Sequence, residues 1–325
     1  MGEFELIRNY FATAPCAQAG EDVALGIGDD CALLALPPGE QLAISTDTLV
    51  AGVHFPDICD PFLLGQRALA VSASDLAAMG ARPIAFTLAL TLPHVDADWL
   101  QAFARGLNQM AQGCALRLIG GDTTRGPLSL TMTVFGGVPS GLALTRSGAR
   151  EGDLLCVGGA LGDAAGALPL VLNQRSAEAS IAAPLLARYW SPQPQLALGQ
   201  ALRGRATSAL DISDGMLADC GHIARASGVR LLIERDRLPI SEPLLALLGL
   251  QAARQAALSG GDDYILAFTL PSAQLPGLQA AGWPVQVIGR AEAGQGVVLL
   301  DSAGNDITPD TRGYQHFGSA ACRDS

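Results

Sequence analysis

The sequence predicts an α/β protein with two domains, and three observations support this fold class. The chain has 325 residues, of which 49% are hydrophobic, and a single core stops growing at about 250–300 residues. Segments with apolar residues at helical spacing alternate with short apolar runs that are typical of buried strands. A polar, glycine-bearing stretch at residues 145–153 separates two such series. We therefore expect one domain at 1–143 and a second at 144–325.

The first series of elements begins with a helix. Residues 61–79 repeat apolar side chains at helical spacing and stop at Gly80, where a glycine is expected after the last turn. The apolar run at 84–92 predicts a buried strand, and the periodic segment at 97–112 predicts a second helix. The remaining strands of this series are expected at residues 116–119, which run into a GGD loop, and at 128–138.

The second series repeats the alternation. An apolar strand at 154–157 is followed by GGALGDAAG, whose glycines miss the G-x-G-x-x-G spacing of a dinucleotide-binding loop. We interpret this segment as a strand-to-helix turn. The other expected elements are strands entering ALDISDG and at 229–234, 264–270 and 285–288, and helices at 163–173, 195–202 and 216–227.

Charge and composition exclude several classes of function. The net charge of −11 and the lack of a basic stripe argue against a nucleic-acid partner. All 20 basic residues are arginine, so chemistry that needs a Walker A, protein-kinase or Schiff-base lysine is impossible. The seven cysteines include no C-x-x-C pair, which argues against a disulfide framework or a zinc site. No apolar run reaches the ~18 residues of a membrane span, so we expect a cytoplasmic protein without a membrane partner.

Five segments share glycine, acidic and hydroxyl residues: GIGDDCALL, ISTDTLVAGVHF, LIGGDTTRG, ALDISDGM and SGGDDYIL. One such segment is explained by a turn, because Gly, Asp and Thr favour loops. Five of them indicate that carboxylates converge, and converging carboxylates repel one another unless a cation compensates. With no lysine and four histidines, a bound divalent cation is the natural counter-charge. Oxygen ligands favour Mg²⁺, which shares its coordination with phosphates, so the pattern favours metal-assisted phosphoryl transfer.

Eight motifs resemble those of bacterial thiamine-monophosphate kinases, in the same order and between residues 25 and 317. They are GIGDDCALL, STDTLVAGVHF, SDLAAMGARP, LIGGDTTRG, TRSGAREGD, DISDG, SGGDDY and GYQHF. The family lies within the superfamily of aminoimidazole ribonucleotide synthetase. The resemblance implies a two-domain α/β (α+β) architecture with mixed sheets flanked by helices. It also implies ATP-dependent phosphorylation of thiamine monophosphate to thiamine diphosphate by direct in-line transfer, with several Mg²⁺ ions, in a homodimer joined through N-terminal strands.

The resemblance also implies a role for particular residues. Asp47, Asp122 and Arg146 are the implied catalytic residues. The implied metal ligands are Asp30, Ser45, Thr46, Asp47, Asp75, Asp122, Asp211 and Asp214. ATP is expected to contact Gly121, Asp122, Arg146 and Ser213, and thiamine monophosphate is expected to contact His54, Asp262 and Tyr314. Because a phosphate monoester has its second pKa near ~6, the attacking oxygen is already anionic at neutral pH and needs no general base.

Two positions depart from the family pattern, and two alternative functions remain open. Ser72 stands where the family has Asn, and Asp262 stands where it has Glu, one methylene longer. One alternative is another ATP-using enzyme of the same superfamily, such as the hydrogenase-maturation dehydratase, selenophosphate synthetase or aminoimidazole ribonucleotide synthetase. The other alternative is a catalytically silent protein that binds nucleotide and metal. A turnover assay separates the silent protein from an enzyme.

Overall fold

The computed structural model describes residues 3–18 and 20–309, and its two large sheets use different parts of the chain. The first sheet has four strands in the order β3-β6-β4-β5. Its only parallel pair is β4 with β5. The strands are β3 (Glu40–Val50), β4 (Arg82–Leu92), β5 (Arg117–Arg125) and β6 (Ser129–Pro139).

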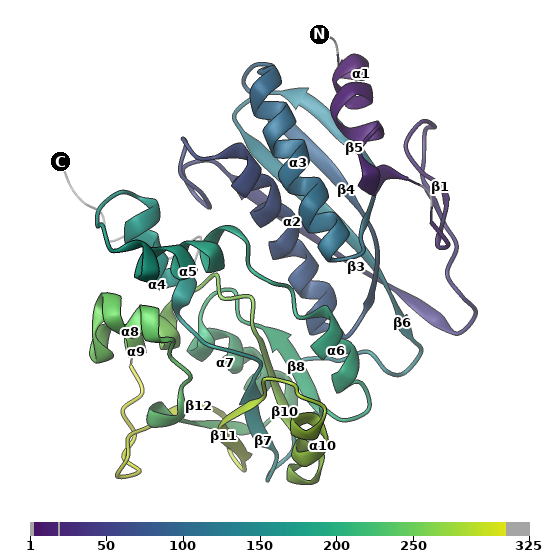
Figure 1. Ribbon diagram of the computed structural model, residues 1–325. Coiled ribbons are helices and arrows are strands. Elements are labelled where there is room, and N and C mark those ends of the chain that lie inside the picture. The colour runs from purple at the N-terminus through teal and green to yellow at the C-terminus, as the bar shows by residue number, and fades with distance from the viewer. Residues whose placement is uncertain (1–2, 19, 310–325) are drawn as a thin grey trace, which may run out of the picture.

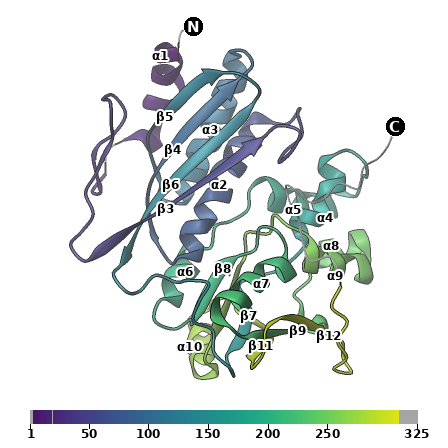
Figure 2. The same cartoon turned by 180° about the vertical axis from the view of Figure 1, so that it is seen from behind.

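Two long helices, α2 (Pro61–Ala78) and α3 (Ala97–Gly113), cover one face of this sheet, and no described helix covers the other, open face (Figures 1 and 2). The helices pack closely because glycines lie at their contact. A Cβ atom on Gly106 would lie 1.9 Å from the Phe62 carbonyl oxygen, and one on Gly65 would lie 2.4 Å from that of Phe103. The Asp60 side chain caps α2 by accepting from the Phe62 N–H at 2.8 Å.

The second sheet has six strands in the order β12-β9-β11-β7-β10-β8, and only β12 with β9 is a parallel pair. Its strands are β7 (Leu154–Val157), β8 (Ser208–Asp211), β9 (Arg230–Glu234), β10 (Leu266–Leu270), β11 (Gln286–Glu292) and β12 (Gly296–Leu300). The helices of this half are α4 (Asp163–Val171), α5 (Ala179–Trp190), α6 (Leu196–Leu202), α7 (Met216–Ser227), α8 (Glu242–Leu248), α9 (Leu250–Ser259) and α10 (Leu275–Ala280). The chain begins with α1 (Glu3–Leu6) and a small hairpin of β1 (Val23–Leu25) and β2 (Leu33–Leu34).

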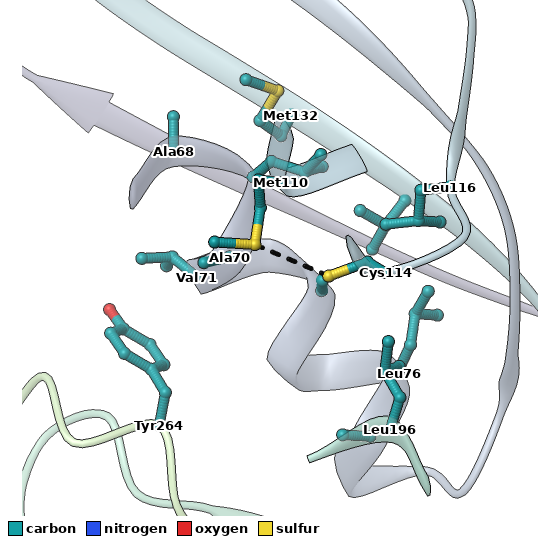
Figure 3. Close-up of a cluster of buried hydrophobic side chains, with 14 of the residues drawn as sticks. Ala68, Ala70, Val71, Leu76, Met110, Cys114, Leu116, Met132, Leu196 and Tyr264 are labelled. Carbon is teal, nitrogen blue, oxygen red and sulfur yellow. Dashed lines mark hydrogen bonds between the residues drawn. The ribbon is translucent and has the colours of Figure 1, made fainter. Parts of the chain in front are cut away.

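The α2 helix lies at the junction between the two halves. Fourteen of its residues are buried, and the largest hydrophobic cluster surrounds it with residues from both sheets. Figure 3 shows this arrangement: Met110 and Leu116 come from the first half, and Leu196 and Tyr264 come from the second. The helix that carries Asp75 is therefore fixed relative to both sheets.

The predicted fold class is confirmed, because the chain contains mixed sheets flanked by helices. Two of the five segments that share glycine, acidic and hydroxyl residues lie in strands: ISTDTLV lies within β3, and the strand expected to end at Ile119 continues through GGDTTR to Arg125. The elements α5, α8, α9, α10 and β12 were not predicted. The domain boundary at 143/144 stays a prediction, although the strands of the two sheets fall at 40–139 and 154–300. Among the described residues, no helix is long and apolar enough to cross a membrane.

Candidate active site between the two sheets

A pocket of about 500 Å³ opens between the two halves. Its walls come from β3, the C-terminal half of α2, residues 145–147 and β8. Four of the predicted site residues line it: Ser45, Asp75, Arg146 and Asp211. An arginine and two carboxylates therefore face one space, as expected where an anionic ligand and a cation are bound together.

Hydroxyl groups tie the carboxylates of the pocket in place. The Ser45 hydroxyl on β3 donates to Asp75 Oδ2 on α2, and the Ser74 hydroxyl donates to Asp211 Oδ2 at 2.6 Å. The second bond joins α2 to the end of β8, across 137 positions of the sequence. Asp75 and Asp211 are therefore oriented before any ligand arrives.

The carboxylates near the pocket resist ionisation because they are buried and close to one another. Burial, followed by repulsion from Asp75, raises the pKa of Asp47 from 3.8 to about 6. The same two causes raise the pKa of Asp211 from 3.8 to about 7. Burial also raises the pKa of Asp75, although the Ser45 hydroxyl and Arg146 partly offset this effect. A bound cation relieves such repulsion.

The predicted ligand atoms are of the type that binds a hard divalent cation, but they are not arranged around a single metal position. Every candidate donor is a carboxylate or hydroxyl oxygen, which suits Mg²⁺. Within residues 3–18 and 20–309, however, no group of three or more His, Cys, Asp or Glu side chains is arranged to hold a metal ion. The buried Ser72 hydroxyl has no well-formed hydrogen bond to any of the described residues. This hydroxyl lies beside Asp47, and its interaction with the carboxylate partly offsets the rise in the pKa of Asp47.

The DISDG and SGGDDY motifs form one backbone-paired unit beside the pocket. The Asp262 N–H donates to the Ser213 carbonyl at 2.8 Å, and the Tyr264 N–H donates to the Ile212 carbonyl at 2.8 Å. The approach is so close that a Cβ atom on Gly261 would lie 2.4 Å from the Ser213 carbonyl oxygen. Gly261 therefore allows the DISDG and SGGDDY segments to touch, and this role differs from turn formation.

A buried carboxylate that the sequence analysis missed fixes the DISDG loop. Asp219 Oδ2 accepts from the N–H groups of Ser213, Asp214 and Gly215 at 3.0, 3.0 and 3.1 Å. Because the Ser213 N–H is already used, the hydroxyl is the donor that Ser213 still offers to a ligand. Burial raises the pKa of Asp219 to about 6. Its place in the first turn of α7 was a visible signal, since acids favour that position.

The predicted acceptor-binding residues His54 and Asp262 are joined through Arg67. The Arg67 Nη2 atom lies 2.8 Å from Asp262 Oδ1 and 3.5 Å from the His54 carbonyl oxygen. Burial raises the pKa of the Tyr264 hydroxyl well above its usual value, so the group stays protonated and donates to Asp262 Oδ1 at 3.1 Å. Tyr314, the third predicted acceptor residue, lies outside the described residues.

Asp122 and Asp47 lie on opposite faces of the first sheet. Strand pairing aligns Asp122 with Ala89, Thr131 and Thr48, so Asp122 points to the open face. Asp47 directly precedes Thr48 on β3, and because successive side chains of a strand alternate between faces, Asp47 points to the helix-covered face. The two carboxylates therefore do not meet within one chain.

Three other predicted residues also lie away from the pocket walls. Gly121 precedes Asp122 on β5, with φ of 147°, and a Cβ atom there would lie 1.8 Å from the Leu88 carbonyl oxygen. Thr46 is exposed and bonds Thr133 at 3.0 Å. Asp30 is exposed in the segment between β1 and β2. The structure thus gathers only part of the predicted set.

The fold and the pocket define an α/β protein of the aminoimidazole ribonucleotide synthetase class. Residues 28–138 match the family described as AIR synthase related protein, N-terminal domain. The thiamine-monophosphate kinase of Escherichia coli (strain K12) is 48% identical over 98% of this chain and 99% of that protein. The chain belongs to the thiamine-monophosphate kinase family.

Solved structures agree with this assignment. The thiamine-monophosphate kinase of Stenotrophomonas maltophilia K279a has a TM-score of 0.81 and 47% identity, over 86% of this chain and 91% of that one. A structure described as AaThiL complexed with AMPPCP and TMP has a TM-score of 0.79 and 28% identity, over 87% of this chain and 89% of that one. The predicted family and architecture are confirmed.

Proposed function

We propose that this enzyme transfers the terminal phosphoryl group of ATP to thiamine monophosphate, giving thiamine diphosphate and ADP. The observation that carries the proposal is 48% identity over nearly the whole chain to a thiamine-monophosphate kinase. A relative that covers most of the chain has been solved with AMPPCP and TMP, an ATP analogue and the acceptor. The pocket between the sheets, with Arg146 and two carboxylates, offers the charges that such a reaction needs.

In the proposed reaction, a phosphate oxygen of thiamine monophosphate attacks the γ-phosphorus of ATP. The new P–O bond forms as the bond from the γ-phosphorus to the β-phosphate oxygen breaks, and ADP leaves with that electron pair. The acceptor phosphate is largely dianionic at neutral pH, so no side chain has to remove a proton. The chain's own contribution is to position two polyanions and to offset their repulsion.

We assign the ATP-binding role to Arg146, Gly121, Asp122 and the Ser213 hydroxyl, and the acceptor-binding role to His54, Asp262 and Tyr314. Asp47, Asp122 and Arg146 are the proposed catalytic residues. Bound Mg²⁺ ions would neutralise phosphate charge, and the proposed ligands are Asp30, Ser45, Thr46, Asp47, Asp75, Asp122, Asp211 and Asp214. Because Asp47 and Asp122 lie on opposite sheet faces, we propose that they serve different ions.

We further propose a cytoplasmic homodimer, with domains at 1–143 and 144–325. The open face of the first sheet supports the dimer, because Leu42 and Ile44 at its edge strand are 39% and 58% exposed. Burial of such apolar side chains against a second copy is favourable. Size-exclusion chromatography with light scattering tests the dimer, and a monomer at micromolar concentration would contradict it.

A direct assay of both products tests the proposed activity. Purified protein is incubated with ATP, Mg²⁺ and thiamine monophosphate, and thiamine diphosphate and ADP are measured together. We expect the two products in equal amounts. ADP without thiamine diphosphate would indicate a different acceptor, and ATP binding without either product would indicate a silent binding protein.

Two variants connect the activity to the site. Asp47→Asn is expected to lose at least ~100-fold in kcat, because removing charge stabilisation of a transferring phosphate costs several kcal/mol. Glu151→Gln is the matched control, since it makes the same chemical change at an exposed position. Near-normal kcat in Asp47→Asn would exclude Asp47 from catalysis.

A further inference from the structure

Arg67 is a buried cation that the proposed chemistry does not use. Its side chain is only 2% exposed, in the middle of α2. Its guanidinium lies over the Tyr189 ring, 4.0 Å from the centroid, and its Nε atom has no hydrogen-bond partner among the described residues. A buried charge is costly unless its partners compensate, so the partners of Arg67 explain its presence.

These partners come from three separate segments. The Nη1 atom donates to the Tyr189 carbonyl at 2.6 Å, at the end of α5. The Nη2 atom donates to Asp262 Oδ1 at 2.8 Å and lies 3.5 Å from the His54 carbonyl oxygen. One guanidinium thus joins α2 to the turn after β3, to α5 and to the SGGDDY segment.

The SGGDDY segment needs such support because its backbone is strained. Asp262 has φ of 69° and Tyr264 has φ of 49°, which is the left-handed region that favours glycine. Strained residues persist only where surrounding contacts hold them. The contacts here are the backbone bonds to Ser213 and Ile212 and the ion pair with Arg67.

Arg67 and Ser74 both contact the paired DISDG and SGGDDY segments from one face of α2. They are seven residues apart, so their side chains lie on the same face, about 10 Å apart along the helix axis. Ser74 holds Asp211 and Arg67 holds Asp262, and the segments that carry these two acids are paired through their backbones. The α2 helix therefore fixes the positions of both Asp211, a proposed metal ligand, and Asp262, a proposed contact of the acceptor.

We propose that Arg67 is a positioning residue for the acceptor substrate, acting through Asp262 and the His54 turn. The inference rests on the proposed function for the identity of the acceptor. The Asp262 side chain is 36% exposed and can meet a ligand, whereas Arg67, at 2%, cannot. Arg67 therefore controls the KM for thiamine monophosphate through the orientation of Asp262.

Lysine cannot replace arginine in this role. The flat guanidinium stacks on Tyr189 and still donates to two carbonyl groups and one carboxylate. A lysine ammonium keeps the charge but has no planar fork. Arg67→Lys therefore tests geometry at constant charge, without leaving Asp262 beside an uncharged side chain.

Steady-state kinetics on four proteins test the proposal: wild type, Arg67→Lys, Asp262→Asn and the double variant. We expect Arg67→Lys to raise the KM for thiamine monophosphate by roughly 10-fold, with less than about a 2-fold change in the KM for ATP. In the Asp262→Asn background the same substitution should add less than about 2-fold, because residues in one network are not additive. Equal rises for both substrates, or an undiminished factor in the double variant, would overturn the proposal.

Hydrogen exchange on the ligand-free protein tests the same proposal without any substrate. The amides of Asp262 and Tyr264, which donate to the Ser213 and Ile212 carbonyls, should exchange at least about 10-fold faster in Arg67→Lys. Arg82→Lys is the control, because Arg82 is ion-paired to Glu40 at 2.9 Å at the far end of β3. Unchanged exchange at both amides would overturn the role of Arg67. Lack of thiamine diphosphate from the wild type would instead refute the proposed function alone.

Discussion

Asp47→Asn is expected to stabilise the metal-free protein while it lowers kcat by at least ~100-fold. Burial and the nearby Asp75 raise the pKa of Asp47 from 3.8 to about 6 in the folded chain. The folded state therefore holds a proton more tightly than the unfolded state does. Between these two pKa values the unfolded chain loses this proton while the folded chain keeps it, so rising pH lowers folding stability.

The size of the effect follows from the pKa difference. The rise in pKa from 3.8 to about 6 corresponds to a loss of about 3 kcal/mol of folding stability, which is complete only above the folded pKa. At pH 5 the carboxyl is still mostly protonated in the folded state, and the loss is only about 1.5 kcal/mol. The amide of Asn does not ionise, so Asp47→Asn should exceed the wild type in stability by an amount that grows from pH 5 to pH 7.5.

Urea denaturation in a chelator measures this difference. The free energy of unfolding is determined at both pH values for the wild type, Asp47→Asn and the exposed control Glu151→Gln. The control should track the wild type within about 0.5 kcal/mol. Adding Mg²⁺ should stabilise the wild type more than Asp47→Asn. A variant that is less stable than the wild type at pH 7.5, in the chelator, would refute the idea that Asp47 is held at a cost to stability.

Three further outcomes are expected. Gly261→Ala should lose about 1–3 kcal/mol of stability by urea denaturation, because its Cβ would lie 2.4 Å from the Ser213 carbonyl oxygen; an unchanged midpoint would mean that the two loops separate easily. Asp219→Ala should lose about 1–3 kcal/mol through its unpaired N–H groups, whereas Asp219→Asn, which keeps an acceptor oxygen, should lose less; equal losses would point to packing. Replacing Mg²⁺ by Ca²⁺, which prefers longer bonds, should preserve nucleotide binding but slow turnover sharply, and equal turnover with both ions would contradict a tight Mg²⁺ geometry.

Long apolar segments with clear ends could be predicted from the sequence, whereas segments with a mixed pattern could not. The α3 helix has clear apolar spacing, and α2, which is buried on most sides, is a long apolar segment that stops before Gly80; the observed ends of both lie within a residue of the expected ones. The β3 strand was missed because its outward side chains include Leu42 and Ile44 while its inward ones include Ser45 and Asp47, which inverts the usual burial pattern. The α5 helix contains Pro184, a residue that normally argues against a helix interior.

The sequence could predict which acidic and hydroxyl residues belong to the site, but not which of them lie together in space. The bond between Ser74 and Asp211 spans 137 positions and depends on how α2 packs against the second sheet. The separation of Asp122 from Asp47 depends on strand order and on the register shift between β4 and β5. A shift of one residue moves a side chain to the other face, and no local pattern reports it.

The acids of the glycine-rich motifs look alike in the sequence, yet the structure gives neighbours opposite tasks. Asp263 points inward and accepts from the Gly162 N–H at 2.9 and 2.8 Å, which caps the start of α4. Asp262, one residue earlier, points to Arg67 and is partly exposed. A carboxylate that caps a helix needs backbone donors, whereas one that meets a ligand needs an open side. Because both demands select Asp beside Gly, composition alone marks the region of the site, and only the partners and exposure of each carboxylate distinguish the helix-capping acid from the one with a side open to a ligand.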